Sequence, residues 1–436
     1  MGWSKSEKNQ IMKPILISLA PNNFSDDVGL SLKTLCQPGV WSKGEDIINL
    51  EEKFVKYLKL PYVFSFNSGR SALMTGLRAL NFPKGSEVIT QAFSCVAIPN
   101  SIKFAGLIPV FADINKSDFN LDIEDLKHKI TKKTKAVIIQ NLFGIPDDIK
   151  KILNLAKKYN LVVIEDCAQC MGAKIDNQLA GTFGKFSFFS FGRDKVISST
   201  FGGLLATKDP KFASALKTEY DNLEFPALSW TFRQLLHPIL FSLAVPTYFS
   251  GQIGKYSIGK GLVYLMQQLN LLDLPVKKPE KKGFNISDYP KKLPNALAIL
   301  ALNQLDKLNK FNKKRKEIAQ YYYSEFKSIK NVRTVSFNKR YDPIFLRFPV
   351  LVSNPSQLRQ FARQWKIILG NWYDSVIAPL GSDIKRSGYS MGSCPQAELK
   401  SKSVLNLPTH PKMSIEDAKR VIKVLKKYYE FYGKRN

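Results

Sequence analysis

The sequence predicts an α/β protein with two domains: a large domain with a mainly parallel sheet wrapped by helices, and a smaller α+β C-terminal domain. Three observations support this. Short apolar runs alternate with helical patterns through the first half of the chain, as in parallel sheets covered by helices. The 436 residues exceed one ordinary core. A long helical pattern then leads into a C-terminal part with its own strand and helix patterns.

The strands of the large domain are expected at short, continuously apolar runs. They are Tyr62–Phe66, Val88–Thr90, Ile108–Phe111, Ala136–Ile139, Leu161–Ile164 and Phe186–Phe191. Continuous apolar runs are typical of strands that are buried on both faces. A helix is expected over Ile149–Tyr159, because its apolar residues recur on one face,.

The rest of the chain gives the expected domain boundaries. Pro294–Phe326 reads as a long connecting helix, Ile344–Val352 as a strand of the small domain, and Ser414–Tyr432 as the last helix. We therefore expect a large domain with an N-terminal arm over residues 1–228 and an apolar and basic insert over 229–283. The connecting helix and the small C-terminal domain then occupy 284–436.

Two side chains after neighbouring strands indicate a covalently held cofactor. Asp166 follows the run Leu161–Ile164, and Lys195 follows the run Phe186–Phe191. Because open α/β sheets place ligands at the carboxyl ends of their strands, both side chains are expected in one pocket. Pyridoxal phosphate needs a lysine amine for a Schiff base and an acid that keeps its ring nitrogen protonated. Lys195 is the predicted Schiff base lysine, and Asp166 is the predicted acid.

A phosphate site is expected where the next helix begins. The run Tyr62–Phe66 is followed by Asn67–Ser71, after which apolar residues recur at helical spacing. Backbone N–H groups at a helix N-terminus bind anions, and Ser68 is placed as the N-cap. An ordinary capped helix would show the same local pattern, so the prediction depends on its combination with Lys195 and Asp166.

Five segments together carry a family pattern. They are Ser68–Leu73, Glu165–Ala173, Phe189–Lys195 with the following Gly202-Gly203, Cys394–Glu398, and Leu405–Pro411. In these segments the chain resembles the DegT/StrS family of sugar aminotransferases. The matches run from about residue 25 to the end, apart from the insert. The resemblance implies a fold-type-I pyridoxal-phosphate transferase, which is the aspartate-aminotransferase fold.

The resemblance also implies roles for individual residues. Lys195 would hold the cofactor and move a proton between the substrate carbon and the cofactor, while Asp166 would pair with the ring nitrogen. Phe93 would stack on the ring face, and Gln169 would lie against the ring near its hydroxyl. The residues implied to hold the phosphate are Ser68, Gly69, Arg70 and Ser190. No metal ligand is implied.

The chain departs from the family pattern around the expected substrate pocket. Arg70 stands where the family has threonine, Lys185 where it has aspartate, and Phe201 where it has glutamate. Near Pro290 and Lys292 the family has an asparagine and an arginine contributed across the dimer, and the asparagine is absent. Cofactor binding is nevertheless expected, because an arginine can also serve an anion, and the substrate pocket is expected to be altered.

The insert has two interpretations. Residues 234–254 carry no charged side chain if His237 is neutral, and Leu262–Leu274 is apolar and followed by the basic cluster Lys277–Lys282. The first stretch is long enough to cross a membrane, but its prolines and glycines argue against a crossing. Apolar anchors beside a basic cluster suit an anionic membrane surface. Alternatively, residues 229–283 pack on their own protein or at a dimer interface.

Composition narrows the choice of partners. The chain has 65 basic and 36 acidic residues, for a net charge of +29, and this charge attracts polyanions such as a nucleotide-linked substrate,. No nucleic-acid partner is expected, because the lysines are scattered rather than interleaved with aromatic residues. Five cysteines favour a reducing compartment, and three scattered histidines form no metal site,. Residues 1–20 show no secretory signal, so the expected location is cytoplasmic, with peripheral membrane binding left open.

The sequence therefore predicts a pyridoxal-phosphate-dependent sugar aminotransferase of polysaccharide biosynthesis. By resemblance, its donor is glutamate, its acceptor is a keto-sugar carried on a nucleotide or lipid, and it works as a homodimer. One alternative is a sugar dehydratase, against which Lys195 counts because the dehydratases of the family replace this lysine by histidine. The other is a non-catalytic or regulatory membrane-associated relative that binds the cofactor.

Overall fold

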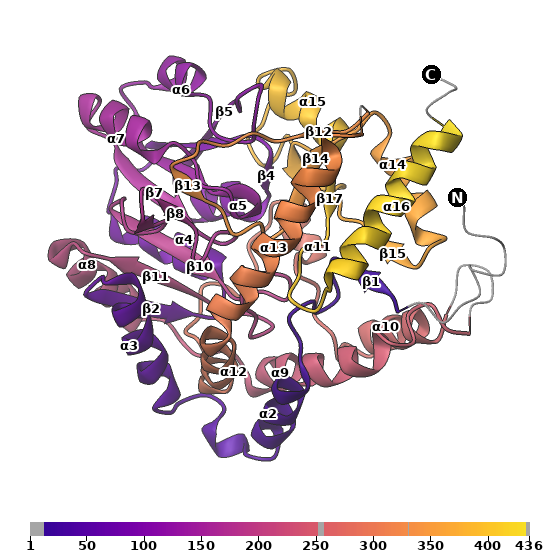
Figure 1. Ribbon diagram of the computed structural model, residues 1–436. Helices are drawn as coiled ribbons and strands as arrows, with labels where there is room; N and C mark the ends of the chain where they lie inside the picture. The colour runs from indigo at the N-terminus through magenta and orange to yellow at the C-terminus, as the bar shows by residue number, and fades with distance from the viewer. Residues whose placement is uncertain (1–12, 252–256, 330, 433–436) are drawn as a thin grey trace.

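A seven-stranded sheet forms the centre of the computed structural model, which describes residues 13–251, 257–329 and 331–432 (Figure 1). Its strand order is β2-β11-β10-β7-β6-β3-β5. All neighbouring strands are parallel except β11, which runs antiparallel to β10 and β2. The strands are β2 (Tyr62–Phe66), β3 (Glu87–Gln91), β5 (Ile108–Ala112), β6 (Thr134–Gln140), β7 (Val162–Asp166), β10 (Phe186–Ser190) and β11 (Gly203–Thr207). The expected mainly parallel sheet is confirmed.

Helices cover both faces of this sheet because its strands are apolar at successive positions. On β6, Ala136 and Ile138 pack in the same core cluster as the helices of one face, while Val137 and Ile139 pack in the cluster of the other face. The helices of the first face are α4 (Gly69–Ala79), α5 (Ala97–Phe104) and α8 (Pro210–Asp221). Those of the second are α6 (Ile123–Lys129) and α7 (Ile149–Lys158).

A further core cluster lies beside β10 and β11. It contains Phe189 and Leu204 from these strands together with residues of α3 (Asp46–Leu58) and α12 (Asn295–Asp306). The long helical pattern after Pro294 divides at Lys307 into α12 and α13 (Leu308–Phe326). α12 therefore belongs to the core of the large domain, and α13 leads out of it.

The C-terminal part has its own core around a three-stranded antiparallel sheet of β12 (Arg333–Thr334), β14 (Phe348–Leu351) and β17 (Val404–Leu407). Its buried apolar side chains come from this sheet and from α13, α14 (Pro355–Arg363) and α16 (Ile415–Tyr432). Near the N-terminus, β1 (Ile15–Leu16) pairs in parallel with β15 (Ile367–Ile368). The expected absence of a secretory signal rests on residues 1–20, of which residues 1–12 lie outside the described part of the chain.

Short elements complete the fold. β4 (Ser94–Cys95) pairs in parallel with β16 (Ile377–Ala378) and so joins the two parts of the chain. β8 (Lys174–Ile175) pairs with β9 (Gln178–Leu179) and with β13 (Tyr341–Asp342). Outside the insert, the described residues also form the helices α2 (Ser25–Leu35) and α15 (Pro395–Ser403) and two 3-10 turns, η1 (Pro38–Val40) and η2 (Leu142–Gly144).

The strand expected over Ile344–Val352 is shorter in the structure. Only β14, Phe348–Leu351, is a strand. Phe345 has a φ of 49°, in the left-handed region that a continuous strand does not use,. The apolar run therefore continues into a buried loop, which ends with Arg347 directed towards Asp194.

The insert forms α9 (Leu228–Ala244), α10 (Ile258–Gln268) and α11 (Lys278–Lys281). Figure 1 shows α9 lying beside α2 and α12, with α10 extending away along the edge of the molecule. α9 contains Pro238 and is buried on one face, whereas α10 buries only Gly259. Among the described residues, no helix combines the length and apolarity needed to cross a membrane.

Candidate active site

A cavity of about 510 Å³ lies at the carboxyl ends of β7 and β10. Its walls come from the strand ends, the start of α4, the start of α5 with Cys95, the lysine segment with the following loop 200–202, the insert, and the segment 371–379 of the C-terminal part. The expected site residues that line it are Ser68, Gly69, Arg70, Asp166, Gln169, Ser190 and Lys195. A volume of this size suits a cofactor together with part of a substrate.

Asp166 and Lys195 face this same cavity. Asp166 is 8% exposed, and its carboxylate accepts a hydrogen bond of 2.9 Å from the backbone N–H of Ala168. Burial raises the pKa of Asp166 to about 6, while that hydrogen bond and the charge of Lys195 act in the opposite direction. A cation placed against this carboxylate would favour its ionised form. Lys195 Nζ lies 4.9 Å from the centroid of the Trp372 ring.

At the expected phosphate site, the start of α4 lies close to the end of β10. Gly69 starts α4, and a Cβ atom there would lie 3.1 Å from both the carbonyl oxygen of Phe189 and the Cβ of Ser190. Ser68 is the N-cap, and its Oγ accepts a 3.1 Å hydrogen bond from the backbone N–H of Ser71. Ser190 lines the cavity beside them. A helix N-terminus with small residues around it can receive an anion.

The Arg70 side chain does not point to this anion position. Its guanidinium forms an ion pair with Glu280, donates a 2.6 Å hydrogen bond to the carbonyl of Pro275, and lies 4.5 Å from the centroid of the Tyr289 ring. These partners all come from residues 275–289, in or next to the insert. The Arg70 side chain therefore connects the insert to α4. Only the backbone of Arg70, at the start of α4, is placed to contact a phosphate.

Phe93 does not line the cavity, contrary to the ring-stacking role expected for it. Its ring is fully buried and stacks on Phe119 at 4.9 Å, with Phe143 and Tyr373 at its edges. Phe93 has a φ of 63°, so the backbone turns sharply after β3. Cys95, two residues later on β4, lines the cavity instead.

Gln169 lies in the cavity wall with its amide fixed at both ends. Its Oε1 accepts a 2.8 Å hydrogen bond from the backbone N–H of Phe143, and its Nε2 donates one of 2.8 Å to the Tyr373 hydroxyl. Tyr373 belongs to the C-terminal part of the chain. The contact therefore joins that part to the large domain at the site.

Sequence reasoning missed the contributions that arrive from distant segments. Trp372 and Tyr373 close one side of the cavity. Arg347 lies 3.3 Å from the Trp372 ring centroid and forms a 2.7 Å ion pair with Asp194 in the lysine segment. An aromatic pair in a loop carries no local signal of such a role. The Trp-Tyr pair and the buried arginine of this C-terminal part therefore had to be seen in the structure.

The last part of the insert forms another wall of the cavity. Leu274, Pro275, Val276, Lys278 and Lys281 line it. Lys277 is held by Asp288 at 2.5 Å and Asp273 at 3.4 Å. The basic cluster of the insert is thus divided between the cavity and local ion pairs.

Comparison with known proteins agrees with this architecture. The model of the DegT/DnrJ/EryC1/StrS aminotransferase family matches residues 26–223 and 265–426. The unmatched stretch between them contains all of α9. Among solved structures, that of DesV from S. venezuelae in complex with a ketimine intermediate has a TM-score of 0.74 and 22% sequence identity, and the match covers 96% of this chain and 99% of that one.

Two curated relatives illustrate the range of matches. The chain is 38% identical over 188 residues to GDP-perosamine synthase of Escherichia coli O157:H7, which covers 43% of this chain and 50% of that protein. It is 25% identical over 399 residues to the pleiotropic regulatory protein of Geobacillus stearothermophilus, covering 89% and 91%. The matched region spans about half the length of the GDP-perosamine synthases.

These matches settle the family and the fold type. The fold-type-I architecture expected from the sequence is confirmed, and the family is one of sugar aminotransferases that indicates pyridoxal phosphate as the cofactor. Since the family model covers well over half of its residues, the chain belongs to the DegT/DnrJ/EryC1/StrS aminotransferase family.

Proposed function

We propose that the protein is a pyridoxal-phosphate-dependent aminotransferase that moves an amino group from a donor, glutamate by expectation, to a keto-sugar carried on a nucleotide or lipid. The observation that carries the proposal is that Lys195 and Asp166 line one cavity at adjacent strand ends. Family membership and relatives named as sugar aminotransferases support it.

The residues of the cavity fit pyridoxal phosphate. An amine, a buried carboxylate and a helix N-terminus surround one space, and these are the three groups that an aldehyde, a ring nitrogen and a phosphate require,. Lys195 would hold the cofactor, Asp166 would face its ring nitrogen, and Ser68, Gly69 and Ser190 would surround its phosphate. When bound, the cofactor supplies an electron sink for the carbon that loses or gains a proton.

The protein's own groups then have separate tasks. The Lys195 amine, positioned beside Trp372, can accept a proton from the substrate carbon and return it,. Asp166 stays ionised when it faces a cationic ring nitrogen, because an opposite charge favours the carboxylate. Gln169 and Tyr373 hold one wall of the cavity through their hydrogen bond. Trp372 and residues of the insert form further walls of the site.

The two alternatives make different demands on this site. A sugar dehydratase of this family would have histidine in place of Lys195, so the lysine favours transfer. A regulatory relative that binds the cofactor would keep the amine and the carboxylate in one cavity, so it differs from the transferase only in lacking turnover. The similarity to a pleiotropic regulatory protein keeps that alternative open to experiment.

A product assay tests the proposal. The purified protein would be supplied with pyridoxal phosphate, incubated with glutamate and a panel of nucleotide-linked keto-sugars, and examined by mass spectrometry for amino-sugars. We expect an amino-sugar from at least one acceptor and none from the Lys195→Ala variant. A product without nitrogen would indicate a dehydratase, and no turnover of any acceptor would favour the regulatory relative.

We further propose that the protein is a homodimer and that the exposed face of α10 lies in the interface. Large apolar side chains are exposed on α10 (Ile258, Tyr264 and Leu265), directly after it (Leu269) and near the end of α9 (Leu243). An anionic membrane surface is the competing occupant. Lys278 and Lys281 line the cavity and Lys277 is ion-paired, so the basic cluster offers that surface less charge than the sequence suggested.

Sedimentation distinguishes these two occupants. The double variant Tyr264→Ser, Leu265→Ser should shift the protein from dimer towards monomer in analytical ultracentrifugation, with no change in binding to anionic liposomes. Loss of liposome binding with an unchanged oligomeric state would favour the membrane surface. A double variant that leaves both measurements unchanged would reject both.

A further inference from the structure

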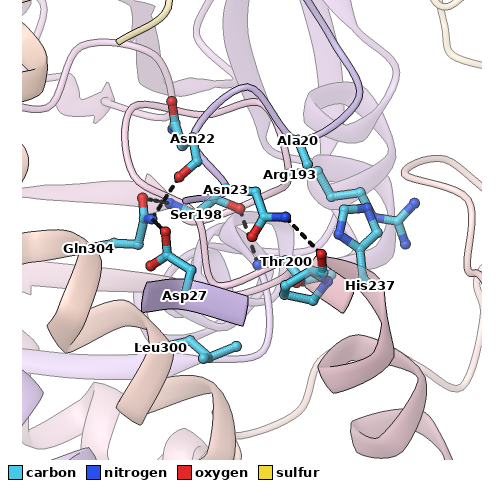
Figure 2. Close-up of a pocket in the computed structure, with 11 residues that line it drawn as sticks. Ala20, Asn22, Asn23, Asp27, Arg193, Ser198, Thr200, His237, Leu300 and Gln304 are labelled. Carbon is cyan, nitrogen blue, oxygen red and sulfur yellow. Dashed lines mark hydrogen bonds between the residues drawn. The ribbon is translucent and has the colours of Figure 1, made fainter. Parts of the chain in front are cut away.

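Arg193 lies two residues before Lys195, and its side chain reaches two spaces. It lines the large cavity, and it also lines a separate pocket of about 20 Å³ beneath the lysine segment. Figure 2 shows the guanidinium beside the imidazole of His237 from α9, with Asn23 and Thr200 nearby. Arg193 therefore lies at the junction of the cofactor loop, the N-terminal segment and the insert.

The Arg193 guanidinium has no anionic partner among the residues that the structure describes. Its Nε and Nη2 atoms are enclosed and make no hydrogen bond within that part of the chain. Its recorded contact is with an aromatic ring, that of Phe201, whose centroid lies 5.3 Å from the guanidinium carbon. Burial lowers the pKa of Arg193 to about 10, which leaves it charged at neutral pH.

The carboxylates near Arg193 are already occupied. Asp194 pairs with Arg347 at 2.7 Å. Asp273 has one carboxylate oxygen held by Arg233 and Gln234 and the other by Lys277. Glu280 forms the ion pair with Arg70 described above. Each of these carboxylates forms an ion pair with another cation within the described part of the chain, and none of them forms one with Arg193.

The nearby charges of Asp273 and Asp194 raise the pKa of Arg193 and so partly oppose the effect of burial, but both carboxylates pair with other cations. His237 is 2% exposed, and burial followed by the nearby charge of Arg193 lowers its pKa well below the usual value, so the imidazole is neutral. The small pocket has room for about one water molecule,. Water can accept a hydrogen bond but carries no charge. A half-buried cation without an ion-paired carboxylate favours an anion as its ligand, and Arg193 is open to one on the side of the large cavity,.

We infer that Arg193 is a specificity residue that binds a carboxylate of a substrate in the large cavity. The cofactor phosphate belongs at the Ser68, Gly69 and Ser190 end, and the diphosphate of a nucleotide carrier is remote from the reacting carbon. An anion beside the lysine segment is therefore a carboxylate, either of the amino donor or of an acidic sugar ring. A carboxylate that approaches Arg193 from the large cavity would make a charge-assisted hydrogen bond with its guanidinium,.

This inference rests on the proposed function, and binding calorimetry on the cofactor-loaded protein tests it separately. The probe for the donor is glutarate, a dicarboxylate that cannot react. The probes for the acceptor are UDP-glucuronate and UDP-glucose, which differ in one carboxylate. The variants are Arg193→Gln, which removes the charge, Arg193→Lys, which keeps it, and Arg340→Gln as a matched control on an exposed arginine paired with Asp176.

We expect Arg193→Gln to lower the affinity for one of the carboxylate probes by about 10- to 100-fold, as the loss of a charge-assisted hydrogen-bonded pair does. That probe is either glutarate or UDP-glucuronate, and in the second case the affinity for UDP-glucose should not change. Arg193→Lys should restore part of the affinity, and Arg340→Gln should bind as the parent does. A loss of affinity for glutarate identifies the donor as the source of the carboxylate, and a loss of affinity for UDP-glucuronate identifies the acceptor as its source. If neither probe is weakened, or if neither binds the parent protein, the inference is overturned.

The proposed function is checked in the same preparations. Reduction with borohydride should fix the cofactor to Lys195 in the parent protein and in all three variants. If that label forms while carboxylate binding is unaffected by Arg193→Gln, the carboxylate inference fails alone. If the label does not form, the proposed function fails.

Discussion

The two halves of the cavity differ in how they relate to the rest of the family. The strand-end half contains Asp166, Ser190 and Lys195, and the family model matches it continuously. The other half is closed by the end of the insert, which follows the unmatched stretch 224–264. The first half contains the residues that would bind the cofactor. The second determines what can reach it.

The two halves also balance charge differently. In the strand-end half, a single buried carboxylate faces a single lysine across the space for the cofactor. In the insert half, carboxylates of the insert hold arginines, as in the pairs of Glu280 with Arg70 of α4 and of Asp273 with Arg233. Arg193, in the lysine segment between the two halves, has no such ion pair among the described residues. Arg233 of the unmatched stretch pairs with Asp273 just beyond it, so this stretch is tied to the part of the insert that forms the substrate side of the cavity.

The largest expected effect tests the strand-end half. The Lys195→Ala variant should lose amino transfer by about a thousandfold or more, because it loses both the covalent attachment and the proton-transferring amine. Single-turnover measurement of amino-sugar formation would show this. The folded state should survive, since Lys195 has no ion pair among the described residues, and circular dichroism of the variant is the control.

The next effect tests how the insert is held. Glu280→Gln should lower the free energy of unfolding by about 3 kcal/mol, because it leaves the largely buried guanidinium of Arg70 without its counter-charge,. Denaturant unfolding provides the measurement. Lys217→Gln, which breaks an exposed pair with Asp221, is the matched control and should cost less than about 1 kcal/mol,. Equal losses in the two variants would contradict a specific role for the buried pair.

Asp166 gives a prediction that depends on pH. Burial raises its pKa from 3.8 to about 6 in the folded protein. The unfolded chain therefore releases the proton first, and the folded state loses stability as the pH rises from about 4 to 6 and keeps that loss above 6. In the cofactor-free protein, Asp166→Asn should then raise the free energy of unfolding at pH 8 by about 3 kcal/mol, with a smaller gain at pH 5.

The same substitution should impair the reaction, since a neutral amide cannot stabilise a protonated ring nitrogen. The comparison of denaturation midpoints at pH 8 and pH 5 checks the stability change, and steady-state rates check the chemistry. A variant that is less stable than the parent at pH 8 would show that the carboxylate is not strained by burial.

The smallest expected effect concerns the exposed part of the insert. Tyr264 on α10 is 64% exposed, so Tyr264→Ser should change the free energy of unfolding of the separated subunit by no more than about 0.5 kcal/mol,. Leu297→Ala on α12, a fully buried site, should cost about 2 to 5 kcal/mol in the same assay,. A large loss for Tyr264→Ser would mean that α10 packs more tightly than its exposure indicates.

The sequence was sufficient where structure depends on local pattern. The runs that became β6 and β7 are apolar on both faces, and Asp166 ends one of them, so the position of the acid followed from strand direction alone. The N-cap role of Ser68 was likewise local. The resemblance to the family then indicated that Lys195 is the Schiff base lysine.

The sequence was insufficient where a side chain depends on residues far along the chain. The Arg70 guanidinium turns to Glu280, 210 residues away, and no local feature announces that partner. Phe93 appeared suited to a cofactor ring, but its positive φ directs the ring to Phe119 and into the core. Arg193 had no predicted role, because its lack of a partner is visible only once the neighbouring carboxylates are seen to be engaged.

The most direct test of the central claim is the chemical identity of the residue that carries the cofactor. The protein loaded with pyridoxal phosphate would be reduced with borohydride, digested, and mapped by mass spectrometry. The account predicts a cofactor adduct on the peptide that contains Lys195, and its disappearance when glutamate is added before reduction. An adduct confined to other lysines, or no adduct at all, would contradict it.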